Sequence, residues 1–112
     1  MIVVLTEMSY APESDDTMRS LVPDVEQFSR QFEGCEQFAL SFPANRPGTL
    51  LGAEVWRDQQ ALRTHVAVAR NAAELEAWHE LLTSMNASLF TASPLGLAAV
   101  TGTGDEKSMT EA

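Results

Sequence analysis

The chain has 112 residues, 45% of them hydrophobic and 21% charged, which suits one globular domain and is too short for two. It carries 7 Lys and Arg against 16 Asp and Glu, a formal charge of −9, and its basic residues do not cluster. Binding to nucleic acid or to an anionic membrane surface depends on basic patches, so neither is an expected partner. A domain of this size buries a limited core, to which a second copy would add.

Cysteine usage and the first residues exclude several further classes. The single cysteine, Cys35, cannot form an internal disulfide, and no zinc or iron–sulfur ligand spacing is present, so no metal site is expected. The apolar run over residues 1–5 is too short for a signal peptide core or a membrane span. The expected location is therefore the cytoplasm.

The first third of the chain predicts a strand followed by a helix. Residues 2–10 are apolar, rich in β-branched side chains and free of Gly and Pro, and both faces of this strand are largely apolar, which is typical of a central strand. After a break at residues 11–14, apolar residues recur every three or four positions, which predicts a helix. Pro23 is expected to kink or restart this helix, and Gly34 to end it. Its apolar stripe consists of Met18, Leu21, Val25, Phe28 and Phe32.

A hairpin and a capped helix are predicted next. Residues 35–42 and 49–56 have strand character and are separated by turn residues. In the first of these strands, alternation places Phe38 on the face opposite to Cys35. Asp58 is expected to cap a helix that extends to about residue 69.

The remaining elements complete an α+β pattern. Residues 71–85 predict a helix whose buried stripe is Leu75, Trp78, Leu82 and Met85. A short fourth strand is predicted over residues 89–93, with an extension to residue 100 left open. Residues 1–100 are therefore assigned to one domain, and the small, polar and acidic residues 101–112 to a disordered tail.

The predicted order, βαββαβ, is that of the ferredoxin-like fold: one four-stranded antiparallel sheet with helices on one face. The other face of the sheet would carry apolar side chains, and their exposure to water is unfavourable. A second copy packed sheet to sheet would cover them. The sequence therefore predicts a homodimer with two-fold symmetry.

The best-marked motif lies at residues 54–65, which read EVWRDQQALRTH. A strand ends in Glu-x-Trp, a short acidic turn follows, and a helix carries Ala-Leu and a His nine residues after the Trp. Together with Gly34-Cys35 at the start of the second strand, this motif resembles that of the antibiotic biosynthesis monooxygenase family. The resemblance implies a dimeric α+β barrel. It also implies a superfamily of cofactor-independent monooxygenases, quinol monooxygenases, haem-degrading enzymes and isomerases, among which fold alone does not choose.

Two departures from the family pattern bear on the substrate. Members that act on polycyclic aromatics often carry an Asn four residues before the Trp, where this chain has Gly52. Haem-degrading members pair an Asn of the first strand with the Trp, and this strand offers Glu7 and Ser9 instead. Haem degradation is therefore disfavoured, and the details of substrate binding do not transfer.

Candidate site residues gather around the motif. Trp56 shares a strand face with Glu54 and Gly52, and if that face meets the helices the three would line one pocket. The indole of Trp56 would then stack on a flat substrate and donate its N–H to an oxygen intermediate, the alternative being a core Trp. His65 is the first candidate for a base that removes a phenolic or carbon-bound proton, and Glu54 the second. The alternative for His65 is local packing.

Two further residues are candidates for substrate binding. Trp78 falls on an apolar helical stripe and is expected to be core or pocket wall. Glu7 lies on a mostly apolar strand face, where desolvation would raise its pKa. The alternative for the strand carboxylates is an ion pair with Arg57, Arg63 or Arg70.

The resemblance thus implies a monooxygenase that oxidises an electron-rich aromatic, hydroquinone or polyketide-type substrate with O₂. No Gly-rich phosphate loop is present, so no flavin or nicotinamide cofactor is expected. Two alternatives stay open. One is a non-catalytic ligand-binding or stress-related dimer with a vestigial pocket, and the other is an isomerase or cyclase that uses the same pocket without O₂.

Overall fold

A computed structural model describes residues 1–101. The sheet consists of β1 (Ile2–Tyr10), β2 (Cys35–Ser41), β3 (Thr49–Trp56) and β4 (Leu82–Thr91). The helices are α1 (Asp15–Arg30), α2 (Gln59–Asn71), α3 (Glu76–Leu81) and α4 (Leu97–Thr101), with single 3₁₀ turns at Pro12–Ser14 and Ala73–Leu75. The tail predicted over residues 101–112 lies outside the described residues except for Thr101, which ends α4.

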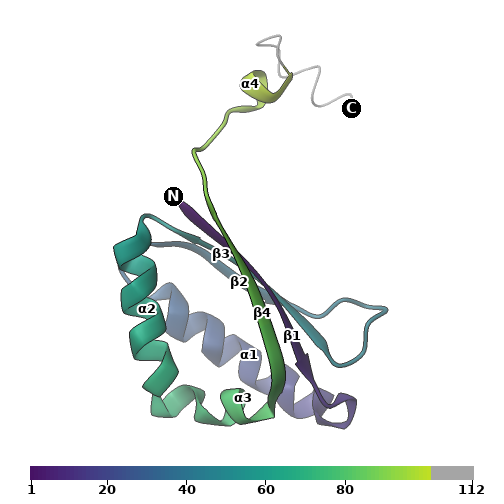
Figure 1. The fold of residues 1–112 in the computed structure, drawn as a ribbon. Coiled ribbons are helices and arrows are strands. Elements are labelled where there is room, and N and C mark those ends of the chain that lie inside the picture. Colours follow the sequence, from purple (N-terminus) through teal and green to yellow (C-terminus); the bar gives the residue numbers. More distant parts are fainter. Residues whose placement is uncertain (102–112) are drawn as a thin grey trace.

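The four strands are antiparallel in the order β2-β3-β1-β4, and α1, α2 and α3 cover one face of the sheet (Figure 1). The predicted ferredoxin-like α+β fold is thereby confirmed. The chain leaves the sheet after β4 and carries α4 away from the helical layer (Figure 1). Among residues 1–101, no helix is both long and apolar enough to cross a membrane.

Strand β1 is central, as predicted, but the helices cover only one of its faces. Its even-numbered residues, from Ile2 to Tyr10, are all buried. Of its odd-numbered residues, Leu5 and Glu7 are exposed, and Val3 and Ser9 are half-buried. One face of the sheet therefore meets the helical core, and the opposite face is open in a single chain.

Helix α1 is continuous through Pro23, so the predicted restart of the helix there is wrong. Pro23 lies on the exposed side of the helix. The buried stripe is also rotated from the predicted one, because Leu21 and Phe28 are only half-buried. The buried residues of α1 are Met18, Val22, Val25 and Ser29.

Strand β2 departs from simple alternation at its first residues. Cys35 pairs with Trp56, and Gln37 with Val55, so one extra residue lies between these two pairs. The register shift turns Cys35 towards the core, where Phe38 also lies, so the prediction that Phe38 faces away from Cys35 is wrong. The predicted strand over residues 49–56 is confirmed as β3.

The predicted helix over residues 71–85 is too long. Helix α3 ends at Leu81, and β4 begins at Leu82, seven residues before the predicted fourth strand. Leu82 pairs with Tyr10 and Met85 with Met8, so neither belongs to a helical stripe. Pairing with a central strand that is distant in sequence has overridden the local helical spacing. The extension of this strand to residue 100 is also wrong, because Leu97–Thr101 is helical.

Candidate functional site

A cavity of about 390 Å³ lies between the inner face of the sheet and the helices. Apolar side chains form most of its wall, including Val4, Met8, Phe38 and Leu62. The residues that bring polar atoms to it are Thr6, Ser29, Glu54, His65, Arg70, Trp78 and His79. A pocket of this size with few polar groups is typical of a small-molecule site.

His65 of α2 is the most distinctive polar residue of the cavity. It is 7% exposed, its Nε2 lies 2.9 Å from Ser29 Oγ, and its Nδ1 is buried without a partner. Burial lowers the pKa of His65 from 6.5 to about 4, so the imidazole is neutral at pH 7. When Nε2–H donates to Ser29, the lone pair of Nδ1 is left free to accept a proton.

Three aromatic rings hold the imidazole of His65 in place. Trp56 lies against it with ring centroids 4.6 Å apart and planes 32° apart. Phe32 and Phe38 meet it edge-on, at centroid distances of 5.1 and 5.7 Å. The ring is therefore fixed by packing as well as by Ser29, which suits a group that has to meet a ligand in one orientation.

Trp56 supports His65 and does not line the cavity. It is fully buried, and its Nε1–H donates to Glu54 Oε1 over 2.8 Å. The indole N–H that was expected to meet an oxygen intermediate is thus already engaged, and the ring that was expected to stack on a substrate lies on His65. The structure places this residue in the core, which was the alternative weighed for it.

Glu54 does reach the cavity. Desolvation raises the pKa of its carboxyl group, and the hydrogen bond from Trp56 opposes that rise in part. Glu54 is therefore a stronger proton acceptor than an ordinary carboxylate. His65 and Glu54, the two predicted bases, line the same cavity from α2 and β3.

The remaining predicted residues divide between the two faces of the sheet. Trp78 of α3 is buried and lines the cavity, and its Nε1–H has no partner. Gly52 faces inwards without lining the cavity, and a Cβ there would lie 3.4 Å from Thr6 Oγ1. Glu7 projects from the opposite face and pairs with Arg46, not with the three Arg residues considered for it. It cannot contact a ligand in this cavity.

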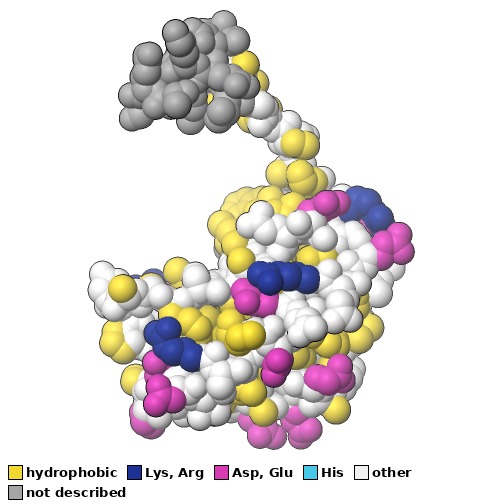
Figure 2. Space-filling model, turned by 180° about the vertical axis from the view of Figure 1, so that it is seen from behind, with side chains coloured by type: hydrophobic (Ala, Val, Ile, Leu, Met, Phe, Trp, Pro, Cys, Tyr) yellow, Lys and Arg dark blue, Asp and Glu magenta, His cyan; other side chains and the backbone are white. Residues whose placement is uncertain are grey.

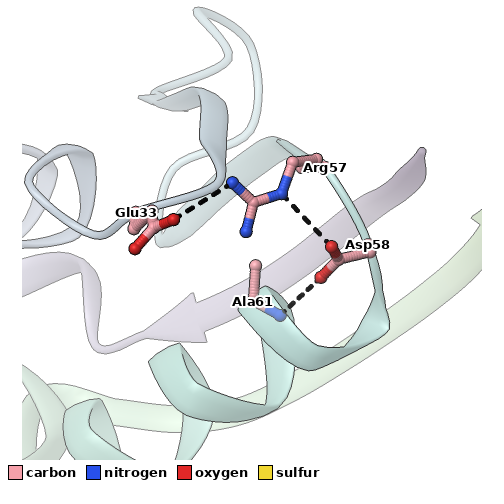
Figure 3. Close-up of polar contacts among 4 residues, drawn as sticks. All are labelled: Glu33, Arg57, Asp58 and Ala61. Carbon is pink, nitrogen blue, oxygen red and sulfur yellow. Dashed lines mark hydrogen bonds and ion pairs between the residues drawn. The ribbon is translucent and has the colours of Figure 1, made fainter.

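The charged residues of the motif fix the start of α2, which carries His65. Asp58 Oδ1 accepts the N–H of Ala61 over 2.9 Å and so caps the helix. Arg57 forms two ion pairs, one with Asp58 at an N–O distance of 3.2 Å and one with Glu33 at 3.3 Å (Figure 3). Because these groups are exposed, their ion pairs add little stability, and their effect is to orient the turn.

The start of β2 is fitted closely to α2. Gly34 has φ +84°, and a Cβ there would lie 2.6 Å from Ala61 Cβ. Its carbonyl also accepts the N–H of Arg57 over 2.8 Å. Gly34 and Ala61, both parts of the resemblance, therefore let helix and turn approach each other. The motif that carries the resemblance therefore serves in large part to hold the site in place.

Ser29 is the site residue that sequence reasoning missed. It is 1% exposed on α1 and positions the imidazole of His65. The spacing Met18, Val22, Val25, Ser29 places a hydroxyl on the apolar stripe of a helix. A polar residue at such a position was the available signal, and it was hidden because the predicted stripe was wrongly phased.

Charge on the surface agrees with the composition. On the face seen in Figure 2, acidic side chains are scattered and the few basic side chains among the described residues form no continuous patch. Within residues 1–101, no three His, Cys, Asp or Glu side chains are grouped so that they could hold a metal ion.

Several solved structures share the fold of this chain over most of its length. A protein from Deinococcus radiodurans that is described as an antibiotic biosynthesis monooxygenase is 25% identical, with a TM-score of 0.74 over 85% of this chain and 95% of that one. SnoaB from Streptomyces nogalater, a cofactor-independent oxygenase, is 19% identical, with a TM-score of 0.67 over 84% and 94%. A protein of unknown function from Bacteroides thetaiotaomicron is 18% identical, with a TM-score of 0.69 over 80% and 94%.

No curated protein matches the chain. The two structures below 25% identity share its fold, and that likeness alone does not assign a reaction. The family described as antibiotic biosynthesis monooxygenase matches residues 1–81, which is more than half of the sequence. The chain therefore belongs to the antibiotic biosynthesis monooxygenase family.

Proposed function

We propose that the chain is a cofactor-independent monooxygenase that oxidises an electron-rich aromatic substrate, such as a hydroquinone or an anthrone, with O₂. One observation carries the proposal: a neutral, buried imidazole, that of His65, lines an apolar cavity with an unpartnered Nδ1. Family membership supports it, as does the likeness in fold to SnoaB, which is itself a cofactor-independent oxygenase.

The reaction requires a base and a water-poor space for the ring. Nδ1 of His65 takes a proton from the phenol or from the ring CH₂, and the substrate anion transfers one electron to O₂. The substrate radical and superoxide then combine, and the imidazolium returns its proton to the resulting peroxide. With an anthrone, loss of water from the hydroperoxide leaves a carbonyl, so one oxygen atom enters the product and the other leaves as water.

The surroundings of His65 and Glu54 determine which of the two is the more suitable base. His65 is fixed by its packing and has a free lone pair on Nδ1 when Nε2–H donates to Ser29, whereas an oxygen of Glu54 already accepts the N–H of Trp56. Protonated His65 would be costly in this cavity when alone, and the substrate anion beside it offsets that cost. His65 is therefore the proposed base, and Glu54 the second candidate.

The test is oxygen uptake by protein freed of metal and flavin, with hydroquinones and anthrones as substrates. His65→Gln should lower kcat roughly 10²–10⁴-fold, the usual contribution of a general base. Glu54→Gln, which keeps an acceptor for the N–H of Trp56, should have the smaller effect. Thr64→Ala, an exposed neighbour of His65 on α2, is the matched control and should leave kcat unchanged.

Three outcomes would contradict the proposal. Unchanged uptake by His65→Gln would exclude His65 as the base. Turnover of the same substrates without O₂ would point to an isomerase or cyclase. Binding without any reaction would point to a ligand-binding protein with a vestigial pocket.

We also propose that the protein acts as a homodimer joined through the open face of the sheet. Leu5 and Phe90 are 49% and 51% exposed there. Val3 lies between Val55 and Phe90 in the strand register, so these apolar residues form one continuous patch. Its exposure to water is unfavourable, and an identical patch on a second copy is a complementary cover.

A further inference from the structure

The two tryptophans of the chain differ in one respect that bears on the ligand. The N–H of Trp56 donates to Glu54, whereas the N–H of Trp78 is buried and has no acceptor. Trp78 is 7% exposed and lines the cavity. Leaving a buried donor unpaired is unfavourable, and folded proteins seldom do so unless water or a ligand supplies the acceptor.

The unpaired donor of Trp78 has a counterpart in the same cavity. Among the described residues, the buried side-chain nitrogen and oxygen atoms without a partner are Trp78 Nε1 and His65 Nδ1. One is an indole N–H that can only donate, and the other is an imidazole nitrogen with a free lone pair when Nε2–H donates to Ser29. The wall around them is mostly apolar.

We propose that Trp78 is a specificity-determining residue whose indole N–H binds a carbonyl or phenolate oxygen on an aromatic ligand, while His65 meets a second polar position of the same ring. This arrangement fits rings with oxygen at one position and an acidic O–H or C–H at another, a requirement that the proposed hydroquinone and anthrone substrates meet. The inference rests on the proposed function for its site, since both residues line that cavity.

The same contact would assist the reaction. When His65 removes a proton, negative charge spreads through the ring onto the conjugated oxygen. An N–H that donates to that oxygen stabilises the charge more strongly in an apolar cavity than water would at the surface. Trp78 would therefore favour formation of the anion that reacts with O₂.

Binding can be tested without any oxidation. The probes are 2,3-dimethyl-1,4-naphthoquinone, whose ring positions are blocked against addition of the Cys35 thiol, and 2,3-dimethylnaphthalene, which has the same rings and no oxygen. Equilibrium dialysis under anaerobic conditions gives their Kd values. Trp78→Phe keeps an aromatic ring but loses both the N–H and part of the ring, so it should weaken quinone binding about tenfold more than hydrocarbon binding, the difference being the worth of one hydrogen bond.

The outcomes separate this inference from the function on which it rests. Equal weakening of both probes would mean that Trp78 only packs against ligands, and unchanged binding of both would mean that water satisfies the N–H; either overturns the inference. If quinone binding is selectively weakened and wild-type protein takes up no oxygen, the inference about Trp78 is supported and the proposed oxygenase activity is contradicted. If Trp78→Phe does not fold, the indole ¹⁵N–H resonance of Trp78 in wild-type protein decides: a downfield shift with the quinone alone supports the inference, and equal positions with both probes refute it.

Discussion

At the scale of single residues, His65 combines two properties that usually conflict. Its ring is buried among Trp56, Phe32 and Phe38, which disfavours the charged form, yet its proposed task is to accept a proton. Ser29 contacts Nε2 and leaves Nδ1 without a partner, so the proton-accepting atom is also the one that the fold leaves unsatisfied. A buried polar atom without a partner is expected where function, not stability, determines the surroundings.

This burial predicts how stability depends on pH. The folded-state pKa of His65 is about 4 against 6.5 for the unfolded chain, so below pH 6.5 the unfolded state binds the proton first. Stability should therefore fall as the pH drops from 6.5 to 4, by at most about 3 kcal/mol from this residue. Urea unfolding at pH 7.5, 6, 5 and 4 measures it.

The matched variant for this prediction is His65→Gln, which cannot titrate and should lose much of that slope. Glu54 acts in the opposite sense, because its raised pKa favours the folded state at low pH, and it is present in both proteins. The difference between the two proteins thus isolates His65. Parallel curves for wild type and His65→Gln would show that the imidazole does not titrate as described.

Trp56 should be a structural residue that acts on the site through its neighbours. Trp56→Phe removes the donor to Glu54 and leaves space beneath His65, so it should destabilise the fold by roughly 1–3 kcal/mol. Trp78→Phe, a change of the same kind at an indole with no internal hydrogen bond, should destabilise it less. Denaturant midpoints for both variants check this order, and equal midpoints would contradict it.

The sequence predicted the position of some site residues correctly and of others wrongly, and the difference has a physical reason. Alternation along β3 gave the correct face for Glu54 and Trp56, but a shared face did not reveal that the Trp56 ring lies under His65. Glu7 belongs to a strand whose two faces are both largely apolar in sequence. Alternation therefore showed which residues share a face with Glu7, but not whether the helices cover that face. Ser29 required the exact phase of a helix, which local spacing left ambiguous.

At the scale of elements, the contact between the turn before β2 and the start of α2 sets the position of His65. Gly34→Ala would force a side chain into a φ of +84° and against Ala61, so it should cost roughly 2–4 kcal/mol. Gly96→Ala is the control, because a Cβ there meets nothing within 4 Å, and it should be nearly neutral. Thermal or urea unfolding gives both values.

A second substitution separates the two causes of the destabilisation expected for Gly34→Ala, which are the contact with Ala61 and the positive φ. Adding Ala61→Gly removes the methyl group that the new side chain would strike, so the double variant should be less destabilised than the sum of the two single changes. The positive φ would still be strained. Strict additivity would mean that the backbone conformation, not the contact with α2, accounts for the whole loss.

The boundary between α3 and β4 shows where local sequence stops being informative about elements. Leu75, Trp78, Leu82 and Met85 recur at helical spacing, but only the first two lie in helical turns, whereas Leu82 and Met85 belong to β4. The choice for Leu82 and Met85 is made by pairing with Tyr10 and Met8, more than 70 residues earlier in the chain. No window of neighbouring residues contains that information, whereas β3 and the capped start of α2 are signalled locally and were predicted correctly.

In the molecule as a whole, the two faces of the sheet have different proposed roles, ligand binding on one and assembly on the other. The inner face forms the cavity with α1, α2 and α3, and the outer face carries the apolar patch around Val3, Leu5 and Phe90. Because side chains alternate along β1, a change at an odd-numbered residue leaves the cavity lining of its even-numbered neighbours in place. Assembly and ligand binding can therefore be perturbed separately.

That separation leads to a prediction for Leu5→Glu. Two copies of the new carboxylate would be buried in the proposed interface of a protein that is already strongly acidic, so the protein should sediment as a monomer while wild type sediments as a dimer. Val68→Glu on α2 introduces the same charge at a similarly exposed position, 46% against 49%, and should leave the dimer intact. A dimeric Leu5→Glu protein, or a monomeric wild type at micromolar concentration, would show that the outer face is not the interface, and the patch would then need another partner.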